Sequence, residues 1–544
     1  MAEPWIQFKN WSFIYENGYA PALRDINLTL YRGEKVLILG ANASGKSTFV
    51  RALSNQLGQG AFQGHSDGKI IRFGKDMTTI DGDPLVSAVD QAEEKEATVM
   101  DKIDWQTLLQ GKDPTAQNTN LSISQTEIYR LISQANYDDS VFIFDEPLAN
   151  LSPQTGEKFL DLMDDVAHAK QASIVFVEYR LEQMLYRPID RVIVLNEGWV
   201  VFDGQVEALL KSEILHTFFI REPLYVTAMR YAGYPLNQVA NIGNVNHIYA
   251  PGLKTSIEKW MLSVPNFLYP ENDTELISFS GVSYQYPERE QATIKGFDLT
   301  LNKGEIVSVL GGNGAGKTTL SRLLSGQFIP NQGQISWKKE TLNHDNLSAF
   351  RRRVSYIPHD PWEKLAPTTV AQQLQASGLA FGMSEDQVQE SMMRSLTALG
   401  LQYAIDFPIE YLSFGQQKRV LLAQALMFDS EILIIDEPTE GQDYYHYNEL
   451  MQYIYTIAHE HHILVIINTH DIDLALEFSH RSLVLRDGQL LADTTPIRVA
   501  VDPLLIKAGG LRESSLYTFA KQIHLLDPYN FVKKFTNYNR AVNQ

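Results

Sequence analysis

Two copies of one glycine-rich loop lie far apart in this chain, and each follows a short apolar run. The defining residues are Gly40, Gly45, Lys46 and Ser47 in the first copy and Gly311, Gly316, Lys317 and Thr318 in the second. In such a loop, backbone N–H groups close around phosphates, the lysine neutralises the β and γ oxygens, and the hydroxyl can bind Mg²⁺. The lysines are 317 − 46 = 271 positions apart. The repeat therefore predicts two phosphate sites, each placed between a strand and a helix.

A glycine-rich turn without a ligand is the alternative interpretation, but the preceding apolar runs and the second copy favour a nucleotide. We expect the nucleotide to contact every position of both loops. The predicted contacts are Gly40, Ala41, Asn42, Ala43, Ser44, Gly45, Lys46, Ser47 and Thr48, and then Gly311, Gly312, Asn313, Gly314, Ala315, Gly316, Lys317, Thr318 and Thr319.

A second pattern follows the second loop, in the stretch LSFGQQKRVLLAQALMFDSEILIIDEPTEGQD at 412–443. Ser413 is a good N-cap, so a helix is predicted to begin at LSFGQ. The apolar run at 432–435 is predicted to be a buried strand with Asp436 and Glu437 at its end. A helix N-terminus that can face phosphate, next to a carboxylate pair, suits hydrolysis of the γ-phosphate of ATP.

The first half of the chain carries an eroded copy of this stretch. LSISQ begins at Leu121 and VFIFDEP contains Asp145 and Glu146. The offsets agree, since 412 − 121 = 291 and 436 − 145 = 291. Each aspartate is predicted to hold Mg²⁺ and each glutamate to position the attacking water. A carboxylate pair can also cap a helix, but its recurrence behind a phosphate loop favours the catalytic role.

Composition limits where such a protein can act. The net charge of −19 disfavours general nucleic-acid binding, although a local basic patch stays possible. With Cys 0, disulfides and thiol chemistry are excluded. No apolar run approaches the roughly 20 residues that span a bilayer, and MAEPWIQFKN lacks the features of a secretory signal. Any membrane role is therefore expected to come through partners.

The duplicated motifs resemble those of an ABC-type ATPase with two fused nucleotide-binding domains. DEPT followed by EGQD, LSFGQ and THD, in a chain without membrane spans, resemble the duplicated ATP-binding protein of energy-coupling-factor importers of the cobalt or thiamine-precursor type. The resemblance covers most of the chain. It implies an α/β fold with two P-loop NTPase domains, each with a RecA-like mixed sheet, an antiparallel β subdomain and a helical subdomain, and with a C-terminal helical extension.

The resemblance also implies roles for single residues. Tyr15 and Tyr286, at the shared offset 286 − 15 = 271, would stack on adenine, although both could be ordinary strand aromatics. The Mg²⁺ site would use Ser47, Gln91 and Asp145 in one half and Thr318 and Asp436 in the other. The signature contacts would be Ser122, Ser413, Gly415 and Gln416. Asp443 would be the D-loop aspartate, and the catalytic residues would be Glu437, His470 and Glu146.

Several positions depart from the family pattern. His359 stands where the family usually has the Q-loop glutamine, and it could also be a plain surface residue. Tyr179 stands where the second half has His470, because 470 − 179 = 291. The helical subdomain spans 412 − 359 = 53 positions in the second half but only 121 − 91 = 30 in the first, which predicts a lost helix.

The sequence predicts four segments: a first ATPase domain at 5–230, a linker at 231–273, a second ATPase domain at 274–500 and an extension at 501–544. The two domains are expected to pair head to tail within the chain, because the linker raises their effective concentration. Site one would then combine Lys46 and Glu146 with the signature at Ser413. Site two would combine Lys317, Glu437 and His470 with the eroded signature, and our hypothesis is that it does most of the hydrolysis.

The function implied is an ATP-hydrolysing subunit, bound peripherally at the cytoplasmic face of the membrane. Its partners would be a transmembrane scaffold protein and a small substrate-binding membrane subunit for a vitamin, a vitamin precursor or a metal ion. A thiamine precursor (hydroxymethylpyrimidine) is the first choice of substrate. Alternatives are the ATPase of a sugar importer and a soluble tandem ATPase acting on ribosomes or nucleic acid. The latter would carry a basic linker, whereas this linker is poor in charge.

Overall fold

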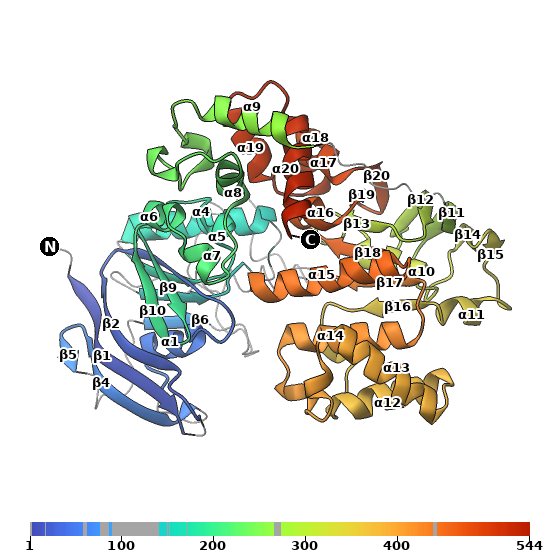
Figure 1. Cartoon of the computed structure of the whole chain (residues 1–544), viewed down its shortest axis with the longest axis horizontal. Coiled ribbons are helices and arrows are strands. Elements are labelled where there is room, and N and C mark those ends of the chain that lie inside the picture. The colour runs from blue at the N-terminus through green and yellow to red at the C-terminus, as the bar shows by residue number, and fades with distance from the viewer. Residues whose placement is uncertain are drawn as a thin grey trace. The chain divides into compact units, whose positions relative to one another are not determined.

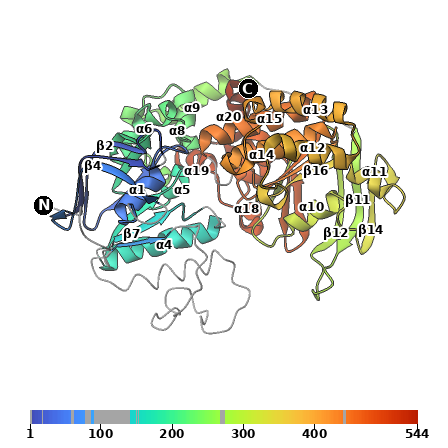
Figure 2. The same cartoon turned by 90° about the horizontal axis from the view of Figure 1, so that it is seen from below.

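The computed structural model describes residues 3–16, 18–57, 62–76, 86–89, 141–148, 151, 153–170, 172–265, 274–438 and 443–543. The chain forms two compact units, Met1–Pro251 with Asp443–Tyr445 and Gly252–Gln442 with His446–Gln544. Figures 1 and 2 label their elements in two views.

The first unit contains two sheets. An antiparallel sheet has the order β2 (Leu23–Tyr31), β1 (Pro4–Tyr15), β4 (Gly64–Arg72) and β5 (Lys75–Asp76). A six-stranded sheet has the order β10 (Trp199–Gly204), β9 (Arg191–Asn196), β3 (Lys35–Leu39), β8 (Ser173–Val177), β7 (Val141–Asp145) and β6 (Val86–Val89). Its helices are α1 (Lys46–Leu53), α4 (Pro153–Lys170), α5 (Leu181–Met184), α6 (Val206–Lys211), α7 (Ile214–Thr217) and α8 (Leu224–Tyr231), with short 3₁₀ turns η2 (Leu236–Gln238) and η3 (Val245–His247).

The second unit repeats this plan. Its antiparallel sheet has the order β12 (Ile294–Asn302), β11 (Glu275–Tyr284), β14 (Gln332–Trp337) and β15 (Glu340–Thr341). Its six-stranded sheet has the order β16 (Val354–Ile357), β17 (Ile432–Asp436), β18 (Leu464–Thr469), β13 (Ile306–Leu310), β19 (Arg481–Arg486) and β20 (Gln489–Thr494). Read from β20 to β16, this order matches that of the first unit from β10 to β6. The duplicated α/β fold predicted from the sequence is confirmed.

The helices of the second half complete the plan. They are α9 (Leu253–Ser263), α10 (Lys317–Leu324), α11 (Leu347–Arg351), α12 (Val370–Phe381), α13 (Glu385–Ala398), α14 (Phe414–Met427), α15 (Tyr444–Glu460), α16 (Ile472–Phe478), α17 (Pro496–Ala500), α18 (Pro503–Gly509), α19 (Ser515–Gln522) and α20 (Pro528–Asn543). The short turns are η4 (Pro361–Glu363), η5 (Gln402–Ala404) and η6 (Ile409–Tyr411).

Parallel pairing explains the apolar runs before the phosphate loops. All five residues of β3 and all five of β13 are buried, because a parallel strand inside a sheet is covered on both faces. Each strand pairs with a parallel neighbour on both sides. The loop that follows is therefore fixed at the carboxyl edge of the sheet, where the adjacent parallel strands also end.

The helical subdomain of the second unit consists of α12, α13 and α14, which lie side by side (Figures 1 and 2). Each begins with a capping box, in which the N-cap hydroxyl and a glutamine side chain three residues later satisfy free N–H groups. Ser413 is the N-cap of α14, and β17 covers the apolar run at 432–435, so both of these sequence predictions are confirmed. The shortened subdomain predicted between Gln91 and Leu121 lies outside the described residues.

The predicted linker at 231–273 contains folded elements in its described part, which ends at 265. Leu236, Ile242 and Ile257 are buried there. Trp260 of α9 packs edge-on against Phe531 of α20, with ring centroids 6.4 Å apart. The four domain boundaries remain a prediction. Within the described part of the chain, no helix combines the length and the apolar character that crossing a membrane requires.

The C-terminal helix α20 closes the end of α16. Arg540 is only 7% exposed, and its guanidinium donates to the carbonyls of Leu476 at 2.7 Å and Glu477 at 2.8 Å and to that of Ser479. A cation at a helix C-terminus complements both the free carbonyls and the helix dipole. The extension is thus joined to the helix that begins just after His470.

We predict that Arg540→Met lowers the free energy of unfolding of the second unit by about 2–4 kcal/mol, because buried carbonyls lose their donor. Thermal unfolding followed by circular dichroism measures the change. Arg498→Met is the matched control, since Arg498 is exposed and should shift the midpoint little. Equal midpoints for both variants would contradict the capping role.

Candidate functional site

The two phosphate loops have the same backbone path. Gly45 and Gly316 are the N-caps of α1 and α10, with φ of 102° and 109°, a region that side chains rarely adopt. A Cβ on Gly45 would lie 2.8 Å from the carbonyl oxygen of Ala22, so glycine is required there. Ala43 has φ of 60° at the position where the second loop has Gly314.

Each loop lysine points back over its own loop. Nζ of Lys46 donates to the carbonyls of Gly40 at 2.7 Å and Ala41 at 2.9 Å, and Nζ of Lys317 donates to that of Gly311 at 2.6 Å. Burial lowers the pKa of Lys46, while the charge of Glu146 opposes this shift. The loop cations are therefore placed where phosphate oxygens can take over from carbonyls as acceptors.

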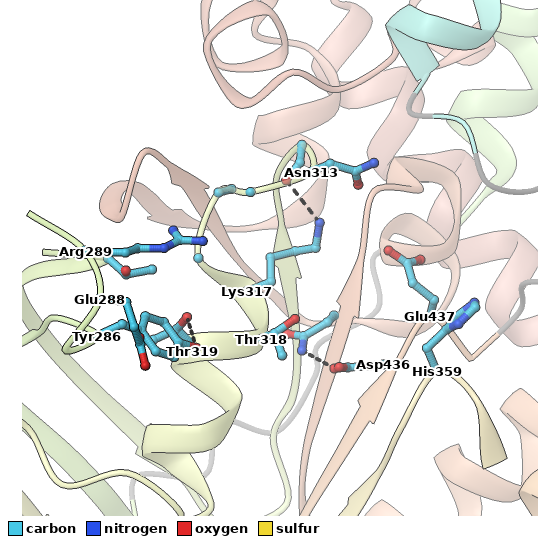
Figure 3. A pocket seen from close by; sticks show the side chains of 16 residues that line it. Tyr286, Glu288, Arg289, Asn313, Lys317, Thr318, Thr319, His359, Asp436 and Glu437 are labelled. Carbon is cyan, nitrogen blue, oxygen red and sulfur yellow. Dashed lines mark hydrogen bonds between the residues drawn. The ribbon is translucent and has the colours of Figure 1, made fainter. Parts of the chain in front are cut away.

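The two tyrosines predicted to stack on adenine have the same surroundings in both halves. The hydroxyls of Tyr15 and Thr48 lie 3.1 Å apart, and those of Tyr286 and Thr319 lie 3.2 Å apart. Figure 3 shows Tyr286 beside Thr319, at the opposite end of the cavity from Glu437. Both tyrosines are partly exposed, so a ring face could receive a base. Their stacking on adenine stays a prediction.

The two candidate catalytic glutamates share a strained backbone. Glu437 has φ of 39° and Glu146 has φ of 49°, which costs a residue with a side chain about 1–2 kcal/mol. The N–H of Glu437 donates to the carbonyl of Asn468, and that of Glu146 donates to the carbonyl of Val177, each at the end of the neighbouring parallel strand. Strain repeated at one position in both halves is typical of a functional turn.

In the second half, the glutamate is held as an anion. His470 Nδ1 lies 3.1 Å from Glu437 Oε1, and the hydroxyl of Thr469 donates to Oε2 at 3.1 Å. Burial alone would raise the pKa of Glu437, but the charge and hydrogen bond of His470, together with Lys317, outweigh it and lower the pKa to about 2. Glu437 is thus ionised at neutral pH and can accept a hydrogen bond from water.

In the first half, the same position meets a second carboxylate. Glu178, fully buried, stands where the second half has Thr469, and it accepts hydrogen bonds from the N–H groups of Leu148 and Tyr179 at 3.1 Å each. Burial, followed by the charges of Glu178 and Asp145, raises the pKa of Glu146 to about 7. At neutral pH Glu146 is therefore partly protonated, whereas Glu437 is ionised.

Asp436 receives a hydrogen bond on each carboxylate oxygen. The hydroxyl of Tyr356 donates to Oδ2 at 2.6 Å, and the amide of Asn468 donates to Oδ1. Burial raises the pKa of Asp436, while these hydrogen bonds oppose the rise. The sequence analysis missed both donors, and it also missed Lys418, whose Nζ donates to the carbonyl of Glu437 at 2.8 Å.

One cavity of about 580 Å³ collects the predicted residues of the second half (Figure 3). Its lining includes Tyr286, the second phosphate loop from Gly312 to Thr319, His359, Asp436, Glu437 and Asn468. The predicted signature contacts Ser413, Gly415 and Gln416 are absent from the lining described for this cavity. They lie at the N-terminus of α14, where the side chains of Ser413 and Gln416 cap the helix.

The cavity has a donor set that fits Mg²⁺. The hydroxyl of Thr318 and the carboxylate of Asp436 are hard oxygen ligands of the kind this ion prefers. Oδ1 of Asn468 is buried and has no hydrogen-bond partner among the described residues, which leaves it available to a metal-bound water. The described residues contain no group of three or more His, Asp or Glu that could hold a metal, so phosphates and waters would complete the shell.

The first half is described less completely. Ser47 and Asp145 are placed by α1 and β7, whereas Gln91 and Ser122 lie outside the described residues. Asp443 is buried directly before α15. Tyr179 is beside Arg180, whose guanidinium lies 5.3 Å from the centre of its ring. Histidine is thus replaced by a phenol next to a cation.

Comparison with known proteins gives the family. Residues 23–149 and 294–440 match the ABC transporter family, and residues 212–284 match a family described as ATP-binding cassette cobalt transporter. A protein of Enterococcus faecalis named as an ABC transporter ATP-binding protein is 34% identical over 100% of both chains. The chain belongs to the ABC transporter ATP-binding protein family.

A protein of Lactiplantibacillus plantarum with the same name is 32% identical over 99% of this chain and 100% of its own. The solved structure of cbiO1 from Clostridium perfringens, part of the ABC transporter complex cbiONQ, is 27% identical and has a TM-score of 0.41, covering 47% of this chain and 100% of its own. As an ABC ATPase, the chain binds and hydrolyses ATP and acts within a transporter complex.

The two glutamates give a pH prediction with opposite signs. The pKa of Glu146 in the folded protein lies above its unfolded value of about 4.3, so its contribution to stability is complete below that value and is lost as the pH rises through about 7. Glu146→Gln should therefore stabilise the first unit at pH 8, by on the order of 1–3 kcal/mol, with the gain shrinking toward pH 5.

Glu437 behaves in the opposite way. Its folded pKa of about 2 lies below the unfolded value, so its contribution is present above about pH 4.3 and is lost as the pH falls through 2. Glu437→Gln should destabilise the second unit at pH 8. Thermal unfolding of both variants at several pH values, in EDTA and without nucleotide, tests this. Shifts of one sign for both variants would refute the contrast.

Proposed function

We propose that this ABC ATPase energises a membrane importer of the energy-coupling-factor type. The observation that carries the proposal is the cavity of the second half, where Lys317, Thr318, Asp436 and Glu437 line one space. It joins a phosphate cradle to an ionised carboxylate, as hydrolysis of the γ-phosphate requires. Binding and release of ATP would drive movement in the attached membrane proteins.

In this proposal, the residues of the second half divide the chemistry. The loop N–H groups and Lys317 bind and orient the phosphates, and Thr318 and Asp436 hold Mg²⁺. The ion, when bound, supplies positive charge that stabilises the transferred phosphoryl group. Glu437 orients the attacking water by accepting its hydrogen bond. His470, 3.1 Å from Glu437, fixes the direction of that carboxylate and supplies a donor to the phosphate.

The residues of the first half favour nucleotide binding over hydrolysis. Tyr179 cannot become a cation as a histidine can, and with a pKa of about 7 a part of the Glu146 population is protonated at neutral pH and cannot receive a proton from water. Each ATP would be shared between one domain's phosphate loop and the other domain's signature. We therefore retain the hypothesis that the site built on Lys317 hydrolyses ATP and the site built on Lys46 mainly binds it.

The partners in this proposal are a transmembrane scaffold protein and a small membrane subunit that binds a vitamin, a vitamin precursor or a metal ion. The family matched by 212–284, described as a cobalt transporter, supports a metal ion over the thiamine precursor favoured from the motifs alone. The ATPase would be attached peripherally at the cytoplasmic face. The net charge of −19 supports protein partners in preference to ribosomes or nucleic acid.

The division of labour predicts unequal effects of two matching substitutions. Glu437→Gln should reduce the steady-state ATPase rate by about 100-fold or more, because a positioned base contributes 10²–10⁴-fold. Glu146→Gln should leave most of the rate. Both variants should still bind ATP, which fluorescence of a labelled analogue can check. A greater loss in Glu146→Gln would refute the assignment.

The transport role predicts which proteins bind this chain in the cell. After mild detergent extraction, affinity-tagged chain should co-purify with a polytopic membrane protein and a small membrane subunit. Uptake of labelled cobalt or vitamin into cells should fall when Glu437→Gln replaces the native chain. Co-purification with ribosomes instead would favour the soluble tandem ATPase.

A further inference from the structure

Two side chains hold the carboxylate of Asp436 from opposite sides, and neither belongs to the motifs that identify the family in this chain. The hydroxyl of Tyr356 on β16 donates to Oδ2 at 2.6 Å. The amide of Asn468 on β18 donates to Oδ1. Asp436 lies at the end of β17, between these two strands, and is 8% exposed. Both oxygens are thus engaged by the neighbouring strands of the sheet.

The same amide reaches the phosphate-loop helix. Nδ2 of Asn468 also donates to the hydroxyl of Ser321 at 2.6 Å, and Ser321 is 1% exposed. Ser321 lies three positions after Thr318 on α10, so the two residues share one face of that helix. Asn468 therefore ties together the two elements that carry the predicted Mg²⁺ ligands, Asp436 and Thr318.

The first half has apolar residues at all three equivalent positions. Strand pairing places Ala88 opposite Ile143 as it places Tyr356 opposite Ile434, and Val177 opposite Asp145 as it places Asn468 opposite Asp436. The loop offset of 271 makes Val50 the equivalent of Ser321. Val50 and Val177 belong to the buried apolar core of the first unit.

This contrast shows whether the polar side chains are required by the fold itself or only by the second site. If the fold required these three polar side chains, both halves would carry them at the same positions, because the backbone plan is the same. The polar set Tyr356, Asn468 and Ser321 occurs in the half that also has His470 and an ionised Glu437. A buried carboxylate with both oxygens hydrogen-bonded has one orientation, and such partners of a metal ligand tune metal affinity by 10–100-fold.

We propose that Tyr356 and Asn468 are positioning residues that orient Asp436 toward the metal of the second ATP site, a role for which the first half has no counterpart at the equivalent positions, Ala88 and Val177. The inference rests on the proposed function, in which Asp436 holds Mg²⁺. It makes the second domain the one whose metal ligands are already aligned with Thr318 before ATP arrives. It also gives a structural cause for unequal hydrolysis that is independent of the signature sequences.

The test measures metal binding directly, in the full-length chain with Lys46→Ala to weaken the first site. Mn²⁺ is titrated in the presence of a non-hydrolysable ATP analogue, and free Mn²⁺ is counted by electron paramagnetic resonance. Tyr356→Phe and Asn468→Val should each raise the half-saturating Mn²⁺ concentration by about 10-fold. Affinity for the analogue in EDTA should change less than about twofold, because loop contacts are retained.

Tyr447→Phe is the matched control. It removes another buried phenol–carboxylate hydrogen bond of the second unit, from Tyr447 to Glu477 Oε2 at 2.5 Å, and Mn²⁺ binding should not change. Tyr356→Phe keeps the ring in place, so it remains informative if Asn468→Val unfolds. Thermal unfolding of each variant shows whether the chain is intact.

Asp436→Asn distinguishes failure of the positioning role from failure of the metal site itself. If it weakens Mn²⁺ binding while Tyr356→Phe and Asn468→Val stay within about twofold of the parent, the positioning role is refuted and the metal site stands. If Asp436→Asn itself leaves Mn²⁺ binding unchanged, the metal site in the proposed function is wrong and the positioning role falls with it. A loss in all three variants, but not in Tyr447→Phe, supports the proposal.

Discussion

Placing two adjacent carboxylates at the end of a buried strand, with hydrogen-bond donors for both, is the constraint on which the site depends. Asp436 and Glu437 follow four apolar residues of β17, and burial by itself favours their neutral forms. The second unit meets this constraint with donors from every neighbouring element: Tyr356 from β16, Asn468 and Thr469 from β18, and His470 just beyond. The turn at Glu437 is held further by Lys418 of α14.

The first unit has the same backbone and a different solution. Its glutamate occupies the same left-handed turn, yet Glu178 stands in place of a hydroxyl and Val177 in place of an amide. Burial raises the pKa of Glu146, and the neighbouring carboxylates of Glu178 and Asp145 raise it further, to about 7. One fold thus gives an ionised glutamate in one half and a partly protonated glutamate in the other at neutral pH.

The proposed function requires two bound nucleotides but not two equal catalytic centres. The two phosphate loops, whose expected role is to bind nucleotide, make matching hydrogen bonds. In both halves the lysine donates to a loop carbonyl, and the tyrosine hydroxyl lies beside a threonine hydroxyl. The two halves differ around the glutamate that would position the attacking water, where Glu178 replaces Thr469 and Tyr179 replaces His470. The C-terminal helix α20 adds a further asymmetry, because Arg540 supports the helix that follows His470.

The sequence by itself determined the duplicated α/β fold, the helix cap at Ser413 and the strand ending at Asp436, because apolar period, capping chemistry and fixed offsets are local or repeated signals. It also placed the two glutamates at matching positions. Only the tertiary structure brought Tyr356 and Asn468 to Asp436, from 80 and 32 positions away. Parallel strands meet their neighbours through long crossovers, so side chains that share an edge leave no pattern in one sequence. The charge state of each glutamate was decided by those neighbours.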